Sequence, residues 1–332
     1  MDVPVWMWVA TIGMILAMLA FDFVGHVRTP HAPTLKEASW WSAGYVGIAV
    51  LFGVGIWAYF GSVYGGEYFA GYITEKSLSV DNLFVFVLIM TSFRVPRLYQ
   101  QKVLLIGITI ALILRTIFIF LGAALIKNFS WVFYIFGAFL IYTAYTQVKS
   151  AREHEDEEYK ENGVLRLTRR FFPTTDAYVE DRMFTKIDGK RYITPMLIVM
   201  IAIGSADLLF AVDSIPAIFG LTQETFLVFA ANAFSLLGLR QLYFLIDGLL
   251  DRLVYLAWGL AAILGFIGIK LLIHALHKNE IPFINGGEHV TAIPEISTAV
   301  SLSFILVTLA ITTVASLAKD KSDRRRLEKE TY

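Results

Sequence analysis

The sequence contains no cysteine, and only 17% of its 332 residues are charged. Without cysteine the chain cannot form disulfides, thiolate metal sites or a cysteine nucleophile. The 28 basic and 28 acidic residues balance, so no positive surface field indicates a nucleic-acid partner. Neither a phosphate-binding G-x-x-x-x-G-K-[ST] loop nor an H-E-x-x-H motif occurs. These absences argue against direct ATP drive and against a zinc hydrolase, and we expect no enzyme.

The sequence is rich in apolar residues. They make up 57% of the chain, above the roughly 45 to 50% of soluble domains. A helix needs about 20 mostly apolar residues to cross a bilayer. We therefore predict an all-α, polytopic membrane protein with about nine transmembrane helices. The predicted spans are 5–23, 42–60, 68–93, 103–125, 131–148, 192–219, 225–246, 253–274 and 296–317.

The basic residues predict the orientation of these spans. Alternate connections hold 22 of the 28 Lys and Arg residues, whereas the intervening connections hold only Lys127 and Lys278. Because short cytoplasmic loops carry the positive excess, we expect the N-terminus outside and the C-terminus inside the cell. Residues 149–191 then form a charged cytoplasmic loop. Its acidic run 153–158 is either a solvated helix face or a weak cation sensor.

Two pairs of segments indicate an internal repeat. Residues 75–82 match 207–214 at a spacing of 132, which places Glu75 on Asp207; residues 114–119 match 239–244 at 125, which places Arg115 on Arg240. The predicted orientations of the two copies are opposite, and inverted repeats are typical of transporters with a midplane site. The expected organisation is two first helices (1–65), a three-helix repeat (66–148), the charged loop (149–191), the inverted repeat (192–274), and an external loop, last helix and basic tail (275–332).

Seven ionisable residues lie well inside the predicted spans. They are Glu75, Lys76, Asp81, Arg115, Asp207, Asp213 and Arg240. Each costs at least ~2.5 kcal/mol at the centre of a transmembrane helix, so a functional site is the first hypothesis. The alternative is a set of ion pairs that hold the bundle together. Four acids against three bases leave one excess negative charge, which static neutralisation would not require.

The helical spacing predicts how these acids are arranged. Residues six apart on one helix lie ~9 Å apart along its axis, too far for one ion to bridge both. In antiparallel packing we expect an outer layer of Glu75 with Asp213 and an inner layer of Asp81 with Asp207. Either layer could hold a cation.

Pro216 predicts a helix break beside this site. Proline has no N–H to bond the carbonyl of Val212, so the helix should kink or break at Asp213. The freed carbonyl would be tolerated where it lines a cavity or holds an ion. Ser214 and the opposed Asn82 would add two further oxygen ligands.

The available ligands are oxygens, since all six histidines fall in loops or at span ends. Carboxylate, hydroxyl, amide and carbonyl oxygens suit Mg²⁺, Ca²⁺ or Mn²⁺. Arg115 and Arg240 do not lose their protons, so we expect them to be fixed counter-charges. Lys76 is either a proton-coupling group or the partner of a neighbouring carboxylate.

These segments also carry a family resemblance. Residues 75–82, 210–217 and 237–240 resemble the signature segments of the TerC/Alx family of integral membrane proteins, and the resemblance extends from Trp6 to about Ser316. It implies a bacterial inner-membrane protein linked to manganese efflux and homeostasis. It also implies that the ion-binding residues are Glu75, Asp81, Asn82, Asp207, Asp213 and Ser214. Relatives often carry Glu where this chain has Gly204, so this site has one fewer negative charge.

Two functions remain open at this point. The first is a secondary transporter that exports Mn²⁺, with Ca²⁺ as the other candidate ion, in exchange for protons. The second is a membrane assembly or metal-delivery factor that binds other membrane proteins through the 149–191 loop and has a regulatory cation site. An intramembrane enzyme is disfavoured, because paired acids without histidine suit ion binding better than hydrolysis.

Overall fold

The computed structural model describes residues 1–27, 33–153, 174–175, 178–187, 190–246, 254–282 and 284–330. Its helices are α1 (Val5–Asp22), continued by the π-helix η1 (Phe23–Val27), α2 (Leu35–Phe60), α3 (Ser62–Ser92), α4 (Arg97–Asn128), α5 (Val132–Glu153), α7 (Pro195–Phe219), α8 (Thr225–Leu236), α9 (Leu239–Ile246), α10 (Leu256–His277), the 3₁₀ turn η3 (Asn285–Gly287) and α11 (Thr298–Glu330). The predicted helical membrane architecture is confirmed, and each predicted span coincides with one helix or with the pair α8 and α9.

Six of these helices are long and apolar enough to cross a membrane, among the residues that the structure describes. They are α1 with η1, α2, α4, α7, α10 and α11, and the bent pair α8 and α9 adds a seventh. Helices α3 and α5 are not among them. The count of nine spans therefore stays a prediction.

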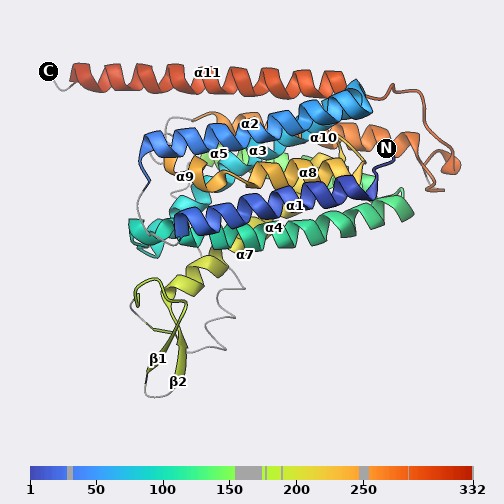
Figure 1. Cartoon of the computed structure of the whole chain (residues 1–332). Helices are drawn as coiled ribbons and strands as arrows, with labels where there is room; N and C mark the ends of the chain where they lie inside the picture. The colour runs from blue at the N-terminus through green and yellow to red at the C-terminus, as the bar shows by residue number, and fades with distance from the viewer. Residues whose placement is uncertain are drawn as a thin grey trace.

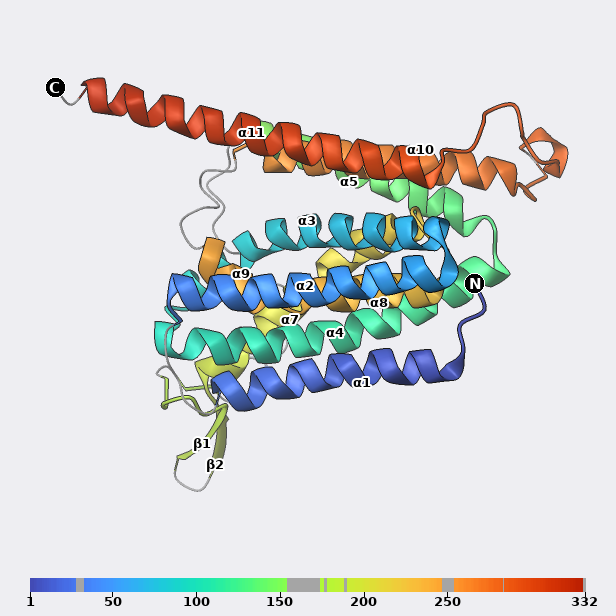
Figure 2. The same ribbon diagram turned by 45° about the horizontal axis from the view of Figure 1, so that its top comes forward.

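The helices form an elongated bundle with the N-terminus at one end and the C-terminus at the other (Figures 1 and 2). Helix α4 packs along α7, α3 along α8, and α10 along α5. The outward faces carry large apolar side chains, such as Leu51 at 72% and Val314 at 67% exposed. A soluble protein rarely exposes apolar surface so widely, so these faces suit the hydrocarbon of a bilayer.

The helix contacts pair the two predicted repeats. In the two predicted repeats α3 corresponds to α7, α4 to α8, and α5 to α10. The contact between α4 and α7 then corresponds to the contact between α8 and α3, and α5 packs against its own counterpart α10. A pair of inverted repeats would pack in this way, although the repeat itself stays a prediction.

Small residues set the distance between α4 and α7. A Cβ built on Gly204 would lie 3.0 Å from Cγ2 of Ile110, tighter than ordinary van der Waals contact. Glycine therefore allows these two backbones to approach closely, as small residues do in membrane helices. This close approach brings Arg115 of α4 beside the acids of α7.

The sequence predicts a kink or a break at Asp213, and the break is wrong. Helix α7 continues through Pro216 to Phe219 as one helix. Pro216 stands in the last turn, where the missing bond to Val212 does not end the helix. The break lies instead between α8 and α9, which are bent by 40°. There Gly238 has φ +85°, a left-handed conformation that glycine adopts without strain.

A small β-hairpin interrupts the helical pattern inside the predicted cytoplasmic loop. Strands β1 (Phe184–Ile187) and β2 (Lys190–Ile193) are antiparallel, and they lie below the N-terminal end of α7 in Figure 1. The chain before them is tied to the bundle by Lys102, whose Nζ lies 2.6 Å from the carboxylate of Asp181. The hydroxyl of Tyr178 also donates to the carbonyl of Phe93. The acidic run 153–158 lies almost wholly outside the described residues.

Candidate functional site

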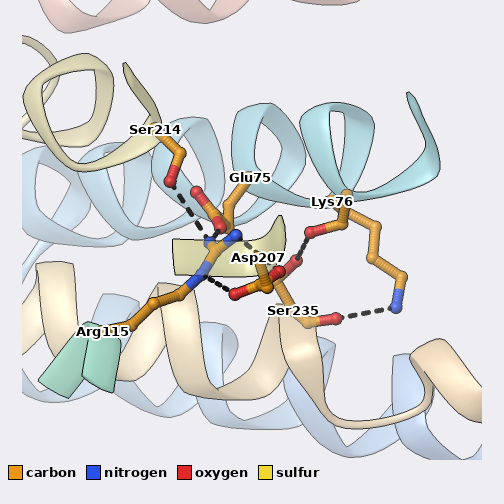
Figure 3. Close-up of polar contacts among 7 residues, drawn as sticks. Glu75, Lys76, Arg115, Asp207, Ser214 and Ser235 are labelled. Atoms are coloured by element: carbon orange, nitrogen blue, oxygen red, sulfur yellow. Dashed lines mark hydrogen bonds and ion pairs between the residues drawn. The ribbon is translucent and has the colours of Figure 1, made fainter. Parts of the chain in front are cut away.

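A single guanidinium joins the two predicted repeats in the middle of the bundle. Nε and Nη2 of Arg115 donate to the two carboxylate oxygens of Asp207 at 2.7 and 3.0 Å. Nη1 donates to Glu75 and, at 3.2 Å, to the hydroxyl of Ser214 (Figure 3). These side chains come from α4, α7 and α3, so the cluster links three helices that are distant in sequence. We call these four residues the Arg115 cluster.

The Arg115 cluster is shielded from solvent and carries excess negative charge. The side chains of Arg115 and Glu75 are 0% exposed and that of Asp207 is 1% exposed. Two carboxylates against one guanidinium give a formal charge of −1 when both acids are ionised. Oε2 of Glu75 is buried and has no hydrogen-bond partner among the described residues. A buried carboxylate oxygen without a partner is costly, so the cluster suits a further proton or cation.

The structure pairs the acids differently from the sequence prediction. Glu75 and Asp207, which the internal repeat aligns, share one guanidinium. We expected Glu75 to lie with Asp213 instead. The prediction considered only the positions of the acids along two antiparallel helices, and it treated Arg115 as a fixed counter-charge rather than as a bridge between two acids. A guanidinium offers five donors in one plane, so it brings two acids together at one level.

The other predicted ligands stand on α3 and α7, the helices that supply the two acids. Asn82 is buried in α3, and Asp213 is half-buried in α7. Val212 is 45% exposed, and the expected break that would free its carbonyl is absent from α7. Asp81 lies in α3, but its side chain lies outside the described part of the chain.

The side chain of Lys76 contacts the broken helix α8–α9. Its Nζ donates at 3.0 Å to the carbonyl of Ser235, in the last turn of α8, and in Figure 3 the side chain extends away from Arg115. The last carbonyls of a helix carry partial negative charge, so an ammonium group stabilises them. The contact links Lys76, the residue after Glu75, to the end of α8 before Gly238. It tests neither of the two roles that the sequence suggests for Lys76.

Arg240 lies in a second cluster, apart from the first. Its Nη2 donates to Asp22 at 2.9 Å and its Nη1 to Gln101 at 2.6 Å. We call these three residues the Arg240 cluster. The sequence analysis passed over Asp22 because this residue stands at the end of the first apolar run. The signal that could have identified Asp22 is the one that identified Glu75, an acidic residue within a predicted apolar span.

No group of three or more Asp, Glu or His residues close enough to hold a metal ion occurs among the described residues. In the Arg115 cluster the guanidinium stands between the two acids. The donor set consists of carboxylate and hydroxyl oxygens, which fits a hard divalent ion.

A cavity of about 550 Å³ lies at the end of the bundle that holds the N-terminus. Ionisable side chains gather in it, and its lining includes Glu67, Glu224, Lys270, His274 and Glu295. The N-terminal amine lies 2.6 Å from Glu224, and His274 lies 2.9 Å from Glu295. Glu67 is eight residues before Glu75 on α3, which is ~12 Å along the helix. Helix α3 therefore contributes Glu67 to the cavity lining and also carries the buried Glu75.

Comparison with known proteins places these features in one family. The profile of the "Integral membrane protein TerC family" matches residues 60–324, which include both clusters except Asp22. "Uncharacterized membrane protein Rv2723" of Mycobacterium tuberculosis is 56% identical over 93% of this chain and 78% of its own length. "Uncharacterized membrane protein STKORF319" of Myxococcus xanthus is 41% identical over 95% of this chain and 93% of its own.

A third relative has a name that states a role. "Putative membrane-bound redox modulator Alx" of Escherichia coli is 41% identical over 80% of this chain and 85% of its own length. No solved structure matches the chain.

Proposed function

Because the chain belongs to the integral membrane protein TerC family, we propose that it is a secondary transporter that exports Mn²⁺ from the cytoplasm. The observation that carries this proposal is the Arg115 cluster, a fully buried pair of acids with one excess negative charge. A charge inside a membrane protein is expensive, and it commonly marks an ion pathway. An integral multi-pass protein with such a pair is suited to moving a cation.

The ligand chemistry favours a hard divalent cation. Two carboxylates and one hydroxyl offer only oxygen ligands, and Asn82 stands two helical turns farther along α3 with an amide oxygen; such ligands suit Mn²⁺ and Ca²⁺. The resemblance that implies manganese makes Mn²⁺ the first choice, with Ca²⁺ as the alternative ion. We place the ion between Glu75 and Asp207, with Asp213, Asp81 and Ser214 along its route.

The outer cavity supports an outward route. Glu67 lines it and accepts a hydrogen bond from Thr222 at 2.6 Å, so one acid of α3 faces this end while Glu75 lies deeper on the same helix. The positive-inside distribution of Lys and Arg assigns this end to the outside, with the N-terminus. We propose that all nine predicted helices span the bacterial inner membrane, including α3 and α5, and that α3 to α5 and α7 to α10 form the inverted repeat.

Proton exchange supplies the driving force in this proposal. In this proposal a proton on Glu75 or Asp207 cancels the excess negative charge while no ion is bound. Its release when a dication enters reduces the change in charge at the dry site from +2 to +1. Uptake of Mn²⁺ into vesicles should therefore respond to an imposed pH gradient. Flux that is indifferent to the gradient would contradict the exchange while leaving export itself intact.

The second candidate function is membrane assembly or metal delivery. The observation that favours it is the hairpin β1–β2, a folded element outside the bundle that is attached through Lys102 and Asp181. The relative's name adds a redox role, but this chain has no cysteine, so it cannot act by thiol–disulfide exchange. Deletion of 174–191 should leave flux intact in a transporter, whereas a docking factor should lose its partner.

The test is Mn²⁺ flux into proteoliposomes that contain the purified chain, with Ca²⁺ and Mg²⁺ as competitors. Wild-type protein should show saturable flux, and Asp207→Asn should lower it by at least about tenfold. Asp22→Asn, which changes a buried acid paired with the other arginine, is the matched control and should retain flux. Absence of flux in wild-type protein that still binds Mn²⁺ would favour the regulatory site of the second candidate.

A further inference from the structure

The Arg115 side chain uses the oxygens that a bound cation would need. Its three nitrogens contact both carboxylate oxygens of Asp207, Oε1 of Glu75 and the hydroxyl of Ser214. These four oxygens, with the partnerless Oε2 of Glu75, form an acidic oxygen cage around one positive group. A divalent ion seeks the same lone pairs, and two positive groups side by side in a buried site repel each other.

From this geometry we propose that Arg115 is a tethered competitor of the transported cation. Its guanidinium neutralises the acids while no metal ion is bound, and an arriving ion displaces it from Glu75 and Asp207. The inference rests on the proposed transport function and replaces the sequence-based expectation of a fixed counter-charge. The site then has two mutually exclusive occupants, the guanidinium of Arg115 and the transported ion.

In this proposal the displaced guanidinium moves along α7, where it already has one contact. Nη1 already reaches Ser214, and the half-buried Asp213 is the adjacent residue of that helix. A flexible arginine that leaves Asp207 in this direction keeps the hydroxyl of Ser214 as a partner. Part of the charge that the ion brings is then balanced without solvent.

The Arg240 cluster provides the matched control. Arg240 is also buried, but among the described residues it donates to one carboxylate, Asp22, and to one amide, Gln101, while Glu37 attracts it from farther away. The pair is neutral, and one acid does not form a site for a dication. A change at Arg240 should therefore leave metal affinity unchanged, even if it lowers stability.

The first test measures Mn²⁺ binding to the full-length protein by equilibrium dialysis. Arg115→Ala removes the competitor, so its affinity for Mn²⁺ should rise at least about tenfold above that of wild type. Arg115→Lys keeps a charge but cannot bridge both acids, so it should fall between the two. Arg240→Ala should match wild type. An Arg115→Ala protein that binds as weakly as wild type, or more weakly, would overturn the proposal.

A second test separates competition from simple repulsion. Guanidinium ion added to Arg115→Ala should raise the apparent Kd for Mn²⁺ in proportion to its concentration, as one occupant excludes the other. A fixed counter-charge instead predicts an effect that saturates once the vacated position is filled, at about the wild-type affinity, and that result would overturn the proposal. If Arg115→Ala does not fold, the affinity of Arg115→Lys decides. Flux and binding in wild type report on the proposed function separately, since their absence would refute transport whatever the variants do.

Discussion

The Arg115 and Arg240 clusters are two buried arginine sites of one protein with different balances of charge. Arg115 contacts two carboxylates and a hydroxyl, and its cluster has a formal charge of −1. Arg240 contacts one carboxylate and one amide, and its cluster is neutral. The two arginines align in the internal repeat, yet only one of them lies between acids.

The difference comes from which helices supply the acids. Glu75 and Asp207 come from α3 and α7, the two first helices of the predicted repeats. Asp22 comes from α1, which lies outside the repeat. A neutral buried pair suits the assembly of the bundle, whereas a cluster with excess negative charge also suits a cation. The predictions below test this division of roles.

The largest expected effect is on transport through the Arg115 cluster. Glu75→Gln removes the excess negative charge and one cation ligand, so Mn²⁺ flux should fall at least about tenfold while Asp22→Asn stays within about twofold of wild type. Flux into proteoliposomes at equal protein incorporation measures both. If Asp22→Asn abolished flux as fully as Glu75→Gln while the protein remained folded, the division between the clusters would be wrong.

The next effect is on stability through the Arg240 cluster. Asp22→Asn leaves the Arg240 guanidinium buried without its carboxylate, which should cost about 3 to 5 kcal/mol of unfolding free energy. The double variant Asp22→Asn with Arg240→Gln removes both charges and should recover much of this loss. Denaturant unfolding in detergent gives the comparison. Equal stability of the single and double variants would show that the buried charge is not the cause.

A third prediction concerns the stability of the turn between α8 and α9, which precedes Arg240 and is measured by denaturant unfolding in detergent. Gly238→Ala places a side chain at φ +85°, and its Cβ would lie 3.0 Å from Cβ of Tyr45. The left-handed conformation alone should cost about 1 to 2 kcal/mol. Gly55→Ala is the control, because a Cβ at that helical position meets no atom within 4 Å. A Gly238→Ala protein as stable as the control would mean that the chain can turn here without a left-handed residue.

Much of this fold was predictable from the sequence because a bilayer restricts it so strongly. Long apolar runs located every long helix, but α2 begins seven residues before its predicted start and α11 ends 13 residues beyond its predicted end. The charges inside these runs identified Glu75, Arg115 and Asp207. The pairing of these residues was not predictable from spacing along single helices, since it depends on the close α4–α7 contact at Gly204 and on the reach of Arg115.

Two local features were missed for different physical reasons. Pro216 predicted a break, but it lies in the last turn of α7. The hydrogen bond that proline removes there affects only the end of the helix. Gly238 caused the break, and a glycine between leucines is a weak signal, because glycine is also common in continuous membrane helices. The role of Asp22 depended on a partner more than 200 positions away, which no local pattern contains.

The smallest effect concerns an ion pair in water rather than in the bundle. Lys102 donates to Asp181 at 2.6 Å and lowers the pKa of this carboxyl below its ordinary value of 3.8. The folded state thus favours the carboxylate, so the pair stabilises the fold above pH 3.8 and the contribution is lost as the pH falls through the lowered pKa. Because Asp181 is 37% exposed, Asp181→Asn should cost at most about 1 kcal/mol. Unfolding curves of wild type and variant should differ at pH 7 and coincide near pH 2; a difference that persists there would mean that packing, rather than charge, holds this contact.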